Sequence, residues 1–390
     1  MSQTETLPSS FDRFQKAAFV IGGVALALCG LGAVQQGSTQ FLQSYLYAYL
    51  FWLGLAMGSF AFMMIGHLAG GRWSAMVLRI LESAALTIPL MALLIIPLLL
   101  KLPKLYIWAQ PEVLLHDSIL QFKQPYLNPQ FFILRTICYF LVWIVISRVV
   151  IGLSHEQDRT GKSLSDKIRS ICGPGVVLYV LTMSFAAFDW AMSLTPHWFS
   201  SIYGVMFMVG QALSTLAFSI IIVAALSHHK PFSEAVSPDR VHDLGKLLFA
   251  FVILWTYVSY GQLVIIWSGN LPEETPWYLV RTKHGWEIIS VVLIVFHFAV
   301  PFFVLLSRHL KRRIEILWNV ALWILFMRLV DLFWIIKPVF SENLALHWMD
   351  IAAVVGIGGL WLAAFIWQLK RRPSLLPLHD DRLELAMGHH

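Results

Sequence analysis

The chain has 390 residues, of which 58% are hydrophobic and only 13% are charged. About a quarter of the residues in a soluble globular domain are charged, so this composition excludes an ordinary soluble enzyme or binding module. The formal net charge is +6. Basic loops of a membrane protein and nucleic-acid binding are two possible reasons for such a charge.

Apolar blocks of roughly the 20 residues that cross a bilayer follow one another along the chain. They predict an all-α integral membrane protein with about ten transmembrane helices. The predicted helices cover residues 17–34, 42–68, 73–100, 128–151, 174–194, 200–226, 244–267, 286–306, 315–336 and 346–369. Pro89 and Pro97 predict a kink in the third helix, because proline lacks a backbone donor. The polar residues 1–15 predict a short cytoplasmic lead without a cleaved signal peptide.

The basic residues predict which side of the membrane each loop faces. With an even number of helices both termini lie on one side, and the loops and tails of that side hold nineteen of the 28 Lys and Arg residues. The opposite loops hold six, and Arg79, Arg135 and Arg328 lie inside predicted helices. Cytoplasmic loops carry the excess of Lys and Arg, so we expect both termini in the cytoplasm. Topology and anionic lipid therefore explain the basic charge, and nucleic acid does not.

The sequence also contains a weak internal repeat. When residues 51–62 are placed on 207–218, five of the twelve positions are identical, and small residues at such spacings let helices approach closely. The fourth and eighth helices both end in Ser-Arg, and Asp189 and Asp331 each precede a proline by seven residues. These matches keep the same order along the chain, so we expect two parallel four-helix bundles with one further helix at each end.

The repeat divides the chain into four regions. They are 1–40, the cytoplasmic lead and first transmembrane helix; 41–198, the first four-helix bundle; 199–340, the second four-helix bundle; and 341–390, the last transmembrane helix and cytoplasmic tail. Internal repeats are common in transport proteins, which place their sites near the repeat interface. A duplicated bundle that serves only as a scaffold fits the same pattern.

Ionisable residues within the predicted helices are the first candidates for function, because each costs at least ~2.5 kcal/mol at the membrane centre. They form a broken polar ladder: Asp189, Asp331, Arg328, Arg135 and Glu287 towards the outside, His297 in the middle, and Arg79, Glu82 and His67 towards the inside. A proton route requires such a ladder, and a histidine can both accept and donate a proton near neutral pH. The alternative interpretation is structural, with Arg79–Glu82 and Arg328–Asp331 as ion pairs within helices and His297 hydrogen-bonded to a neighbour.

The cysteines and histidines show no pattern that is typical of a redox centre. The three cysteines have neither CxxC spacing nor an iron–sulfur run. A bis-histidine haem needs two facing imidazoles at similar depth, and His297 has no such partner. We therefore expect no haem, iron–sulfur cluster, metal or covalently bound cofactor in this chain, and no catalytic residues.

Two segments near the predicted outer surface are rich in polar and aromatic residues. The first covers 188–199, and the second runs from Tyr257 to Tyr278. The interfacial aromatic belt explains their Trp and Tyr residues, but it does not explain Gln262 within a helix or the turn at 270–274. A quinone ring needs one or two hydrogen-bonding groups beside an apolar slot, and docking of a partner protein fits equally well. The candidate contacts are Tyr260, Gln262, Asn270, Glu273 and Glu274.

These two segments, with Phe188-Asp189-Trp190 in one and the Gln262-to-Glu274 stretch in the other, resemble the NrfD/polysulfide-reductase membrane family. Within that family the chain resembles the smaller of the two such subunits in bacterial alternative complex III. The resemblance covers nearly the whole chain. It implies a multi-pass subunit of the bacterial inner membrane, in a respiratory complex that oxidises quinol and reduces a periplasmic acceptor. That acceptor would be a cytochrome c or a high-potential iron–sulfur protein.

The resemblance also implies partners and a role. The partners would be a multihaem cytochrome c, an iron–sulfur protein, a larger paralogue of this chain, and lipid. Menaquinone or another quinone would bind within the complex, while this chain would carry no redox centre and contribute a proton path and support. The alternatives are a subunit that itself oxidises quinol as the anchor of a molybdoenzyme-type complex, a secondary transporter, and a structural anchor without a path.

Overall fold

The protein is described by a computed structural model that covers residues 7–372 and 374–377. Within these residues ten helical segments are long and apolar enough to cross a membrane, and there is no β-strand. The prediction of an all-α, multi-pass membrane protein is therefore confirmed. The first residues of the expected cytoplasmic lead and most of the expected tail lie outside the described residues.

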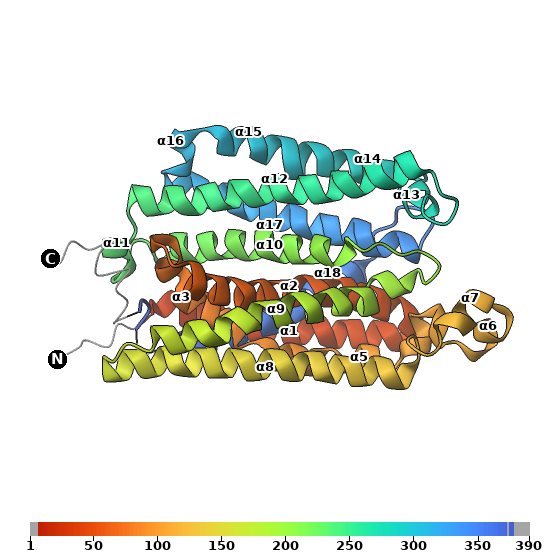
Figure 1. Cartoon of the computed structure of the whole chain (residues 1–390), viewed down its shortest axis with the longest axis horizontal. Helices are drawn as coiled ribbons and strands as arrows, with labels where there is room; N and C mark the ends of the chain where they lie inside the picture. Colours follow the sequence, from red (N-terminus) through yellow and green to blue (C-terminus); the bar gives the residue numbers. More distant parts are fainter. Residues whose placement is uncertain (1–6, 373, 378–390) are drawn as a thin grey trace.

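The helices lie side by side along the long axis of the molecule (Figure 1). The first five spans are α1 (Ser9–Gln36), α2 (Ser38–Ala69), the broken segment α3 (Arg72–Ala85), α4 (Ile88–Leu94) and α5 (Ile96–Leu99), α8 (Pro129–Thr160), and α9 (Ser165–Trp190). The last five are α10 (Tyr203–Leu226), α12 (Pro238–Gly269), the segment α14 (Trp286–Val292), η4 (Leu293–Ala299) and α15 (Val300–Leu306), α17 (Ile314–Ile336), and α18 (Trp348–Lys370).

Short helices connect the spans at both ends. They are η1 (Leu102–Lys104), η2 (Ile107–Ala109), α6 (Pro111–His116), α7 (Ser118–Lys123), η3 (Met192–Leu194), α11 (Phe232–Ala235), α13 (Pro276–Val280), α16 (Arg308–Lys311) and η5 (Lys337–Val339). We call the end where α1 begins and α18 ends the terminal end, and the end where α6 and α7 project the loop end (Figure 1).

Local sequence explains where the spans break and stop. The third span breaks before α4 and again before α5, and each of these helices has its proline, Pro89 or Pro97, in its first turn. The predicted kink is therefore confirmed. Helix α8 continues nine residues beyond the predicted end at 151, until Gly161 stops it in the left-handed conformation. The extra turns carry side chains into the terminal end.

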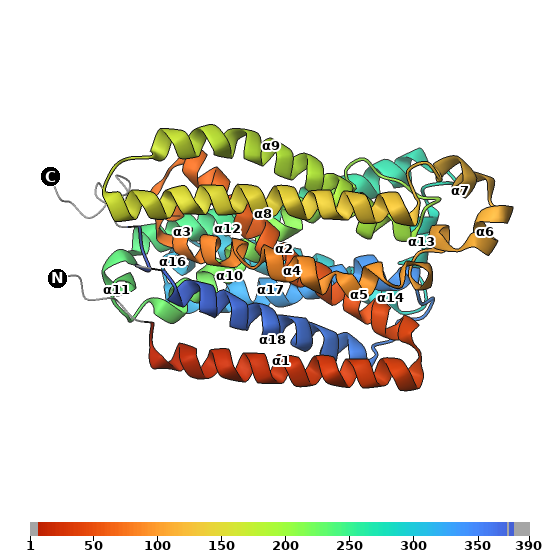
Figure 2. The same ribbon diagram turned by 90° about the horizontal axis from the view of Figure 1, so that it is seen from below.

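The spans pack as two groups of four. Helices α2, α3–α5, α8 and α9 form the first bundle, and α10, α12, α14–α15 and α17 form the second. Helix α1 packs along α18, which in turn contacts α2 and α3 (Figure 2). The two bundles meet where α2 lies against α10, and these are the two helices that the internal repeat aligns.

The contact between α2 and α10 depends on small residues. A Cβ atom added to Gly58 would lie 2.3 Å from the hydroxyl oxygen of Thr215 and 2.5 Å from the carbonyl oxygen of Gln211. The Thr215 hydroxyl donates to the carbonyl of Leu55 on α2, at 3.3 Å. Close backbone approach of this kind is the usual way in which helices associate in lipid, so the repeat interface follows from the glycine spacing of α2.

Candidate functional site

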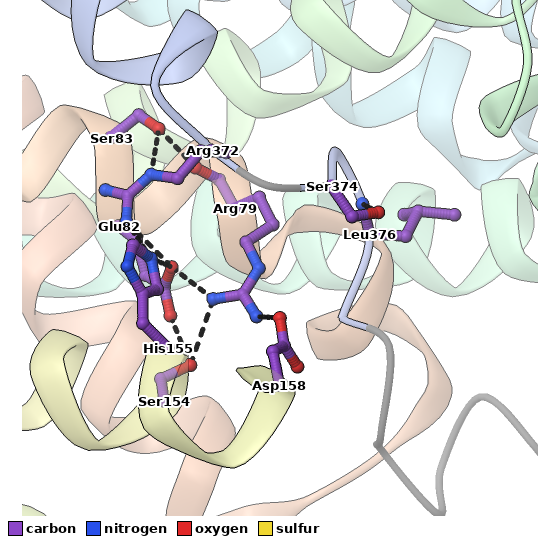
Figure 3. A network of polar contacts seen from close by, with 9 residues as sticks. All are labelled: Arg79, Glu82, Ser83, Ser154, His155, Asp158, Arg372, Ser374 and Leu376. Carbon is purple, nitrogen blue, oxygen red and sulfur yellow. Dashed lines mark hydrogen bonds and ion pairs between the residues drawn. The ribbon is translucent and has the colours of Figure 1, made fainter. Parts of the chain in front are cut away.

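A buried polar network lies at the terminal end of the first bundle (Figure 3). Arg79 and Glu82 of α3 form an ion pair at 2.6 Å, and Arg79 also pairs with Asp158 of α8. The hydroxyl of Ser154 donates to Glu82 at 2.7 Å. The ion pair between Arg79 and Glu82, which the sequence offered as the structural alternative to a proton path, is present, and both residues are almost fully buried.

Two further residues complete this network and were not identified from the sequence. Arg372, just beyond α18, lies 3.5 Å from the Glu82 carboxylate and donates to Ser83 at 3.2 Å. The ring of His155 lies 3.6 Å from Glu82 and also contacts Arg372 (Figure 3). The sequence signal was the polar run 154–158, which belongs to the extra turns of α8. Together, Arg79, Arg372, Glu82 and Asp158 balance two positive charges with two negative ones.

The aspartate of the first bundle sits in a fully bonded site. Asp189 on α9 accepts two hydrogen bonds from Arg135 on α8, both at 2.9 Å, and a third from Tyr139 at 2.8 Å. The remaining guanidinium nitrogen of Arg135 donates to the carbonyl of Tyr126, also at 2.9 Å. Every nitrogen of the guanidinium and both oxygens of the carboxylate therefore have protein partners. This site ties α8 to α9.

The aspartate of the second bundle has a sparser environment. Asp331 pairs with Arg328 of the same helix, α17, and accepts one longer bond of 3.3 Å from the indole nitrogen of Trp255 on α12. The Nε atom of Arg328 has no partner among the described residues. Gly210 makes room for this guanidinium, because a Cβ atom there would lie 2.1 Å from Arg328 Nη2.

His297 lies beside this pair and is fully buried. Its ring meets that of Trp255 edge to face, with the ring centroids 4.2 Å apart, and neither ring nitrogen has a partner among the described residues. It belongs to η4, a π-helical turn, and such turns occur frequently at functional sites. Because a buried polar group without a partner costs about 1–3 kcal/mol, His297 is not explained as a structural residue.

A polar stripe runs along α10 between the bundles. Gln211, Thr215 and Ser219 recur every fourth residue and therefore share one face of the helix. Gln211 accepts from the hydroxyl of Tyr179 at 2.9 Å, whereas Ser219 and the neighbouring α2 residue Ser59 have hydroxyls without partners among the described residues. Helix α10 starts near the loop end and also packs against α3, so the stripe lies between the Asp331 site and the Glu82 network.

A cavity of about 480 Å³ opens between α12 and α14 of the second bundle. Its inner wall includes Trp255 and Asp331, and its loop-end wall includes Tyr278 and Arg281. Tyr260 lines the cavity and is 64% exposed. Gln262 is buried on the other side of α12, and its amide has no partner among the described residues. The two residues therefore do not form one ligand site, although the sequence placed them together.

The other predicted site residues are spread along the molecule. Glu287 is exposed in the first turn of α14 and accepts from the backbone of Gly285. Asn270 ends α12 in the left-handed conformation, and Glu273 lies exposed in the turn that follows. The remaining two lie apart from the clusters: Glu274 is half-buried in the same turn, and His67 is buried near the end of α2, where its carbonyl accepts from Arg169.

A second buried acid, besides Asp158, was not identified from the sequence. Asp350 in the first turn of α18 binds Lys337 at 2.8 Å and accepts from Ser44 of α2 at 2.6 Å. It lies in the first turns of the last predicted helix, 346–369, where an acidic residue is expected to face the membrane surface, and only the three-dimensional structure buries it. Among the described residues, no group of three His, Cys, Asp or Glu side chains is arranged to hold a metal ion.

Comparison with known proteins adds no assignment: no family model matches this chain, and no curated protein matches it. The candidate site therefore rests on its geometry.

Proposed function

We propose that this chain is a membrane subunit of a quinol-oxidising respiratory complex and that it conducts protons without holding a redox centre. The observation that carries the proton path is the second-bundle site. There a fully buried histidine with two unpartnered ring nitrogens packs against Trp255, whose indole donates to a sparsely bonded carboxylate, Asp331. A carboxylate and an imidazole are groups that exchange protons near neutral pH.

The proposed path leads from Asp331 and His297, past Arg328 and Gly210, along the polar face of α10 to the Glu82 network. Buried polar groups without protein partners are commonly hydrated by internal water, and Ser59 and Ser219 supply such groups on this route. At the terminal end Glu82 and His155 would exchange the proton with the aqueous phase. His155 is the more accessible of the two, with a side chain that is 34% exposed.

Charge distribution supports an orientation for this path. The side that holds the termini carries nineteen of the 28 basic residues, so the terminal end would face the cytoplasm of a bacterial inner membrane. Protons would then pass between Glu82 on the cytoplasmic side and Asp331 towards the periplasmic side. Asp189 and Arg135 are left out of the path, because their hydrogen bonds are already made within the protein.

The assignment to a respiratory complex rests on the family resemblance of the two aromatic and polar segments. A larger paralogue would supply the quinone site, and multihaem cytochrome and iron–sulfur subunits would carry the electrons to a periplasmic acceptor. The transporter alternative predicts helix breaks in matching positions of both halves. The breaks do not match: the third span is broken where its counterpart α12 is continuous, and η4 interrupts the eighth span whereas α8 is continuous.

Co-purification tests membership of the complex. A tagged form of this chain is extracted from its native membrane in mild detergent, and the proteins that accompany it are identified. We expect multihaem cytochrome and iron–sulfur subunits in stoichiometric amounts. Isolation of the chain alone under conditions that keep other respiratory complexes intact would contradict the proposal.

Proton release tests the path. The intact complex carrying Asp331→Asn or His297→Leu is placed in vesicles, and quinol-driven proton release is measured together with electron transfer. We expect release to fall while the subunit composition is unchanged. Tyr139→Phe, a change at the matching site of the first bundle, is the control and should leave release unchanged. Normal release in both second-bundle variants would exclude this route.

A further inference from the structure

Arg281, between α13 and α14, is a buried cation without an anionic partner. Its side chain is 2% exposed, and no carboxylate among the described residues forms an ion pair with it. It stacks on the ring of Trp277, with its guanidinium carbon 3.4 Å from the ring centroid. Burial lowers the pKa of Arg281 to about 9, which reflects how little negative charge surrounds it. Four other buried arginines, Arg79, Arg135, Arg328 and Arg372, each have a carboxylate partner.

The hydrogen bonds of Arg281 leave part of its capacity unused. It donates to the carbonyls of Trp277, Trp334 and Ile335, at 2.5, 3.1 and 2.6 Å. The last two carbonyls end α17, and a helix carboxyl end offsets only about half of a unit charge. A guanidinium has five N–H donors, so two remain for a further acceptor. The position therefore favours an anion.

The cavity beside Arg281 has a polar end and an apolar end. Arg281, Tyr278 and Thr282 line it near the loop end, whereas Leu293, Ile294 and Phe298 line it about two to three turns deeper along α14 and η4. No hydrogen bond to protein is made by the hydroxyl of Tyr278 or Tyr260 within the described residues. The volume of about 480 Å³ falls in the range of small-molecule sites. This arrangement matches a molecule with an anionic head and a hydrocarbon tail.

We propose that the Arg281 cavity binds an anionic phospholipid, with the phosphate at Arg281 and one acyl chain along Leu293, Ile294 and Phe298. The opening of the cavity favours a lipid over a soluble anion. Ile294 and Tyr260, on its two sides, are 62% and 64% exposed on a surface of transmembrane helices. Trp267 is also exposed in the last turn of α12, and such an aromatic side chain lies at the level of the lipid head groups.

The lipid would also have a structural consequence. Asp331 lies in the inner wall of the cavity, and a bound acyl chain would separate this carboxylate from the surrounding bilayer. The binding of lipid does not depend on proton conduction, so either proposal can fail without the other.

Native mass spectrometry of the purified chain tests the proposal. Phosphatidylglycerol and phosphatidylcholine with identical acyl chains are titrated separately onto protein in a neutral detergent. We expect the chain to retain phosphatidylglycerol in preference to phosphatidylcholine. Arg281→Gln should weaken phosphatidylglycerol binding about tenfold, because a charge-assisted hydrogen bond is lost, and Arg281→Lys should keep part of the affinity.

Two further variants distinguish lipid binding in the cavity from nonspecific charge attraction and from misfolding. Lys283→Gln removes an exposed positive charge from the same connection and should leave the preference unchanged. Leu263→Trp fills the cavity while Arg281 is kept, and it should also release the lipid, which covers the case in which Arg281→Gln fails to fold. An unchanged lipid preference in Arg281→Gln or Leu263→Trp would overturn the proposal. Displacement of phosphatidylglycerol by inorganic phosphate at the same concentration would also overturn it, since the site would then bind a soluble anion.

Discussion

The two bundles place an aspartate at matching positions of the repeat but surround it differently. Asp189 is held by Arg135 and Tyr139 of the neighbouring helix through three short hydrogen bonds. Asp331 pairs with Arg328 of its own helix and receives one longer bond from an indole. The first site is a link between helices, whereas the second leaves polar atoms free for other partners.

The two bundles also differ at the loop end of the molecule. Segment 101–127 covers the first bundle, where the hydroxyl of Tyr106 donates to the carbonyl of Trp190 at 2.9 Å and the indole of Trp108 donates to Ser193 at 3.2 Å. The second bundle instead has the cavity that reaches Asp331. The first aspartate is therefore enclosed by protein partners, whereas the second lies in the wall of a cavity.

The largest expected effect is on stability when the first-bundle aspartate is replaced. Asp189→Asn leaves the Arg135 guanidinium buried without a counter-charge, and breaking a buried pair in this way costs about 3–5 kcal/mol. Asp331→Asn also removes the counter-charge of Arg328, but it should cost less, because it disturbs one longer hydrogen bond to a second helix, that from Trp255, instead of three short ones. Denaturant unfolding of both variants in detergent micelles measures the difference. Equal losses would mean that the two sites do not differ as described.

A smaller difference in unfolding free energy is expected when a neutral side chain at each aspartate site, Tyr139 or His297, is replaced. Tyr139→Phe removes a hydrogen bond to a charged group, which is worth about 1.5–3 kcal/mol. His297→Leu removes a buried imidazole whose nitrogens have no protein partner, so the unfolding free energy should stay unchanged or rise by up to about 1–3 kcal/mol, the cost of those unpartnered groups. The same unfolding assay serves for both variants. A large loss in His297→Leu would show that this histidine is a structural residue.

The interface between the bundles offers a matched pair of glycines. Gly58→Ala should destabilise the protein by about 1–3 kcal/mol, because the new Cβ atom would lie 2.5 Å from the backbone oxygen of Gln211. Gly54→Ala should be milder, since its nearest neighbour is a side-chain carbon of Gln211 at 3.3 Å. Thermal unfolding of the two variants gives the comparison. If Gly54→Ala is the more harmful change, the packing of α2 on α10 is wrong.

The smallest expected effect is on the stability of segment 101–127, which lies over the loop end of the first bundle. Asp117 caps α7 and also contacts the ring of His197, at 2.6 Å. The pKa of Asp117 lies below its ordinary value, chiefly because the backbone N–H of Leu120 donates to it. The stability that the ionised Asp117 carboxylate contributes is therefore fully present above the unfolded-state pKa, about 3.9. It is lost as the pH falls through the lower folded-state pKa. The protection factors of the α7 amides, which correct for the intrinsic pH dependence of hydrogen exchange, should fall at acidic pH, and Asp117→Asn should remove that fall.

The sequence was sufficient for the ten spans, the proline breaks and the pairing of Arg79 with Glu82, because hydropathy, proline chemistry and helical spacing are local properties. It was insufficient where distant segments meet. Arg372 meets Glu82, and Asp158 meets Arg79, only through folding, and α8 proved longer than its apolar part. Gln262 and Tyr260 were grouped because they are close in sequence, yet residues two apart on a helix face different directions. The cavity at Arg281 left no periodic signal at all.

Infrared difference spectroscopy of the reduced and oxidised complex tests the central claim most directly, because a carboxylic acid that gains or loses a proton changes its carbonyl absorption. We predict that quinol oxidation produces such a band, that Asp331→Asn removes it, and that Tyr139→Phe retains it. A band that persists in Asp331→Asn would contradict a proton path through the second bundle.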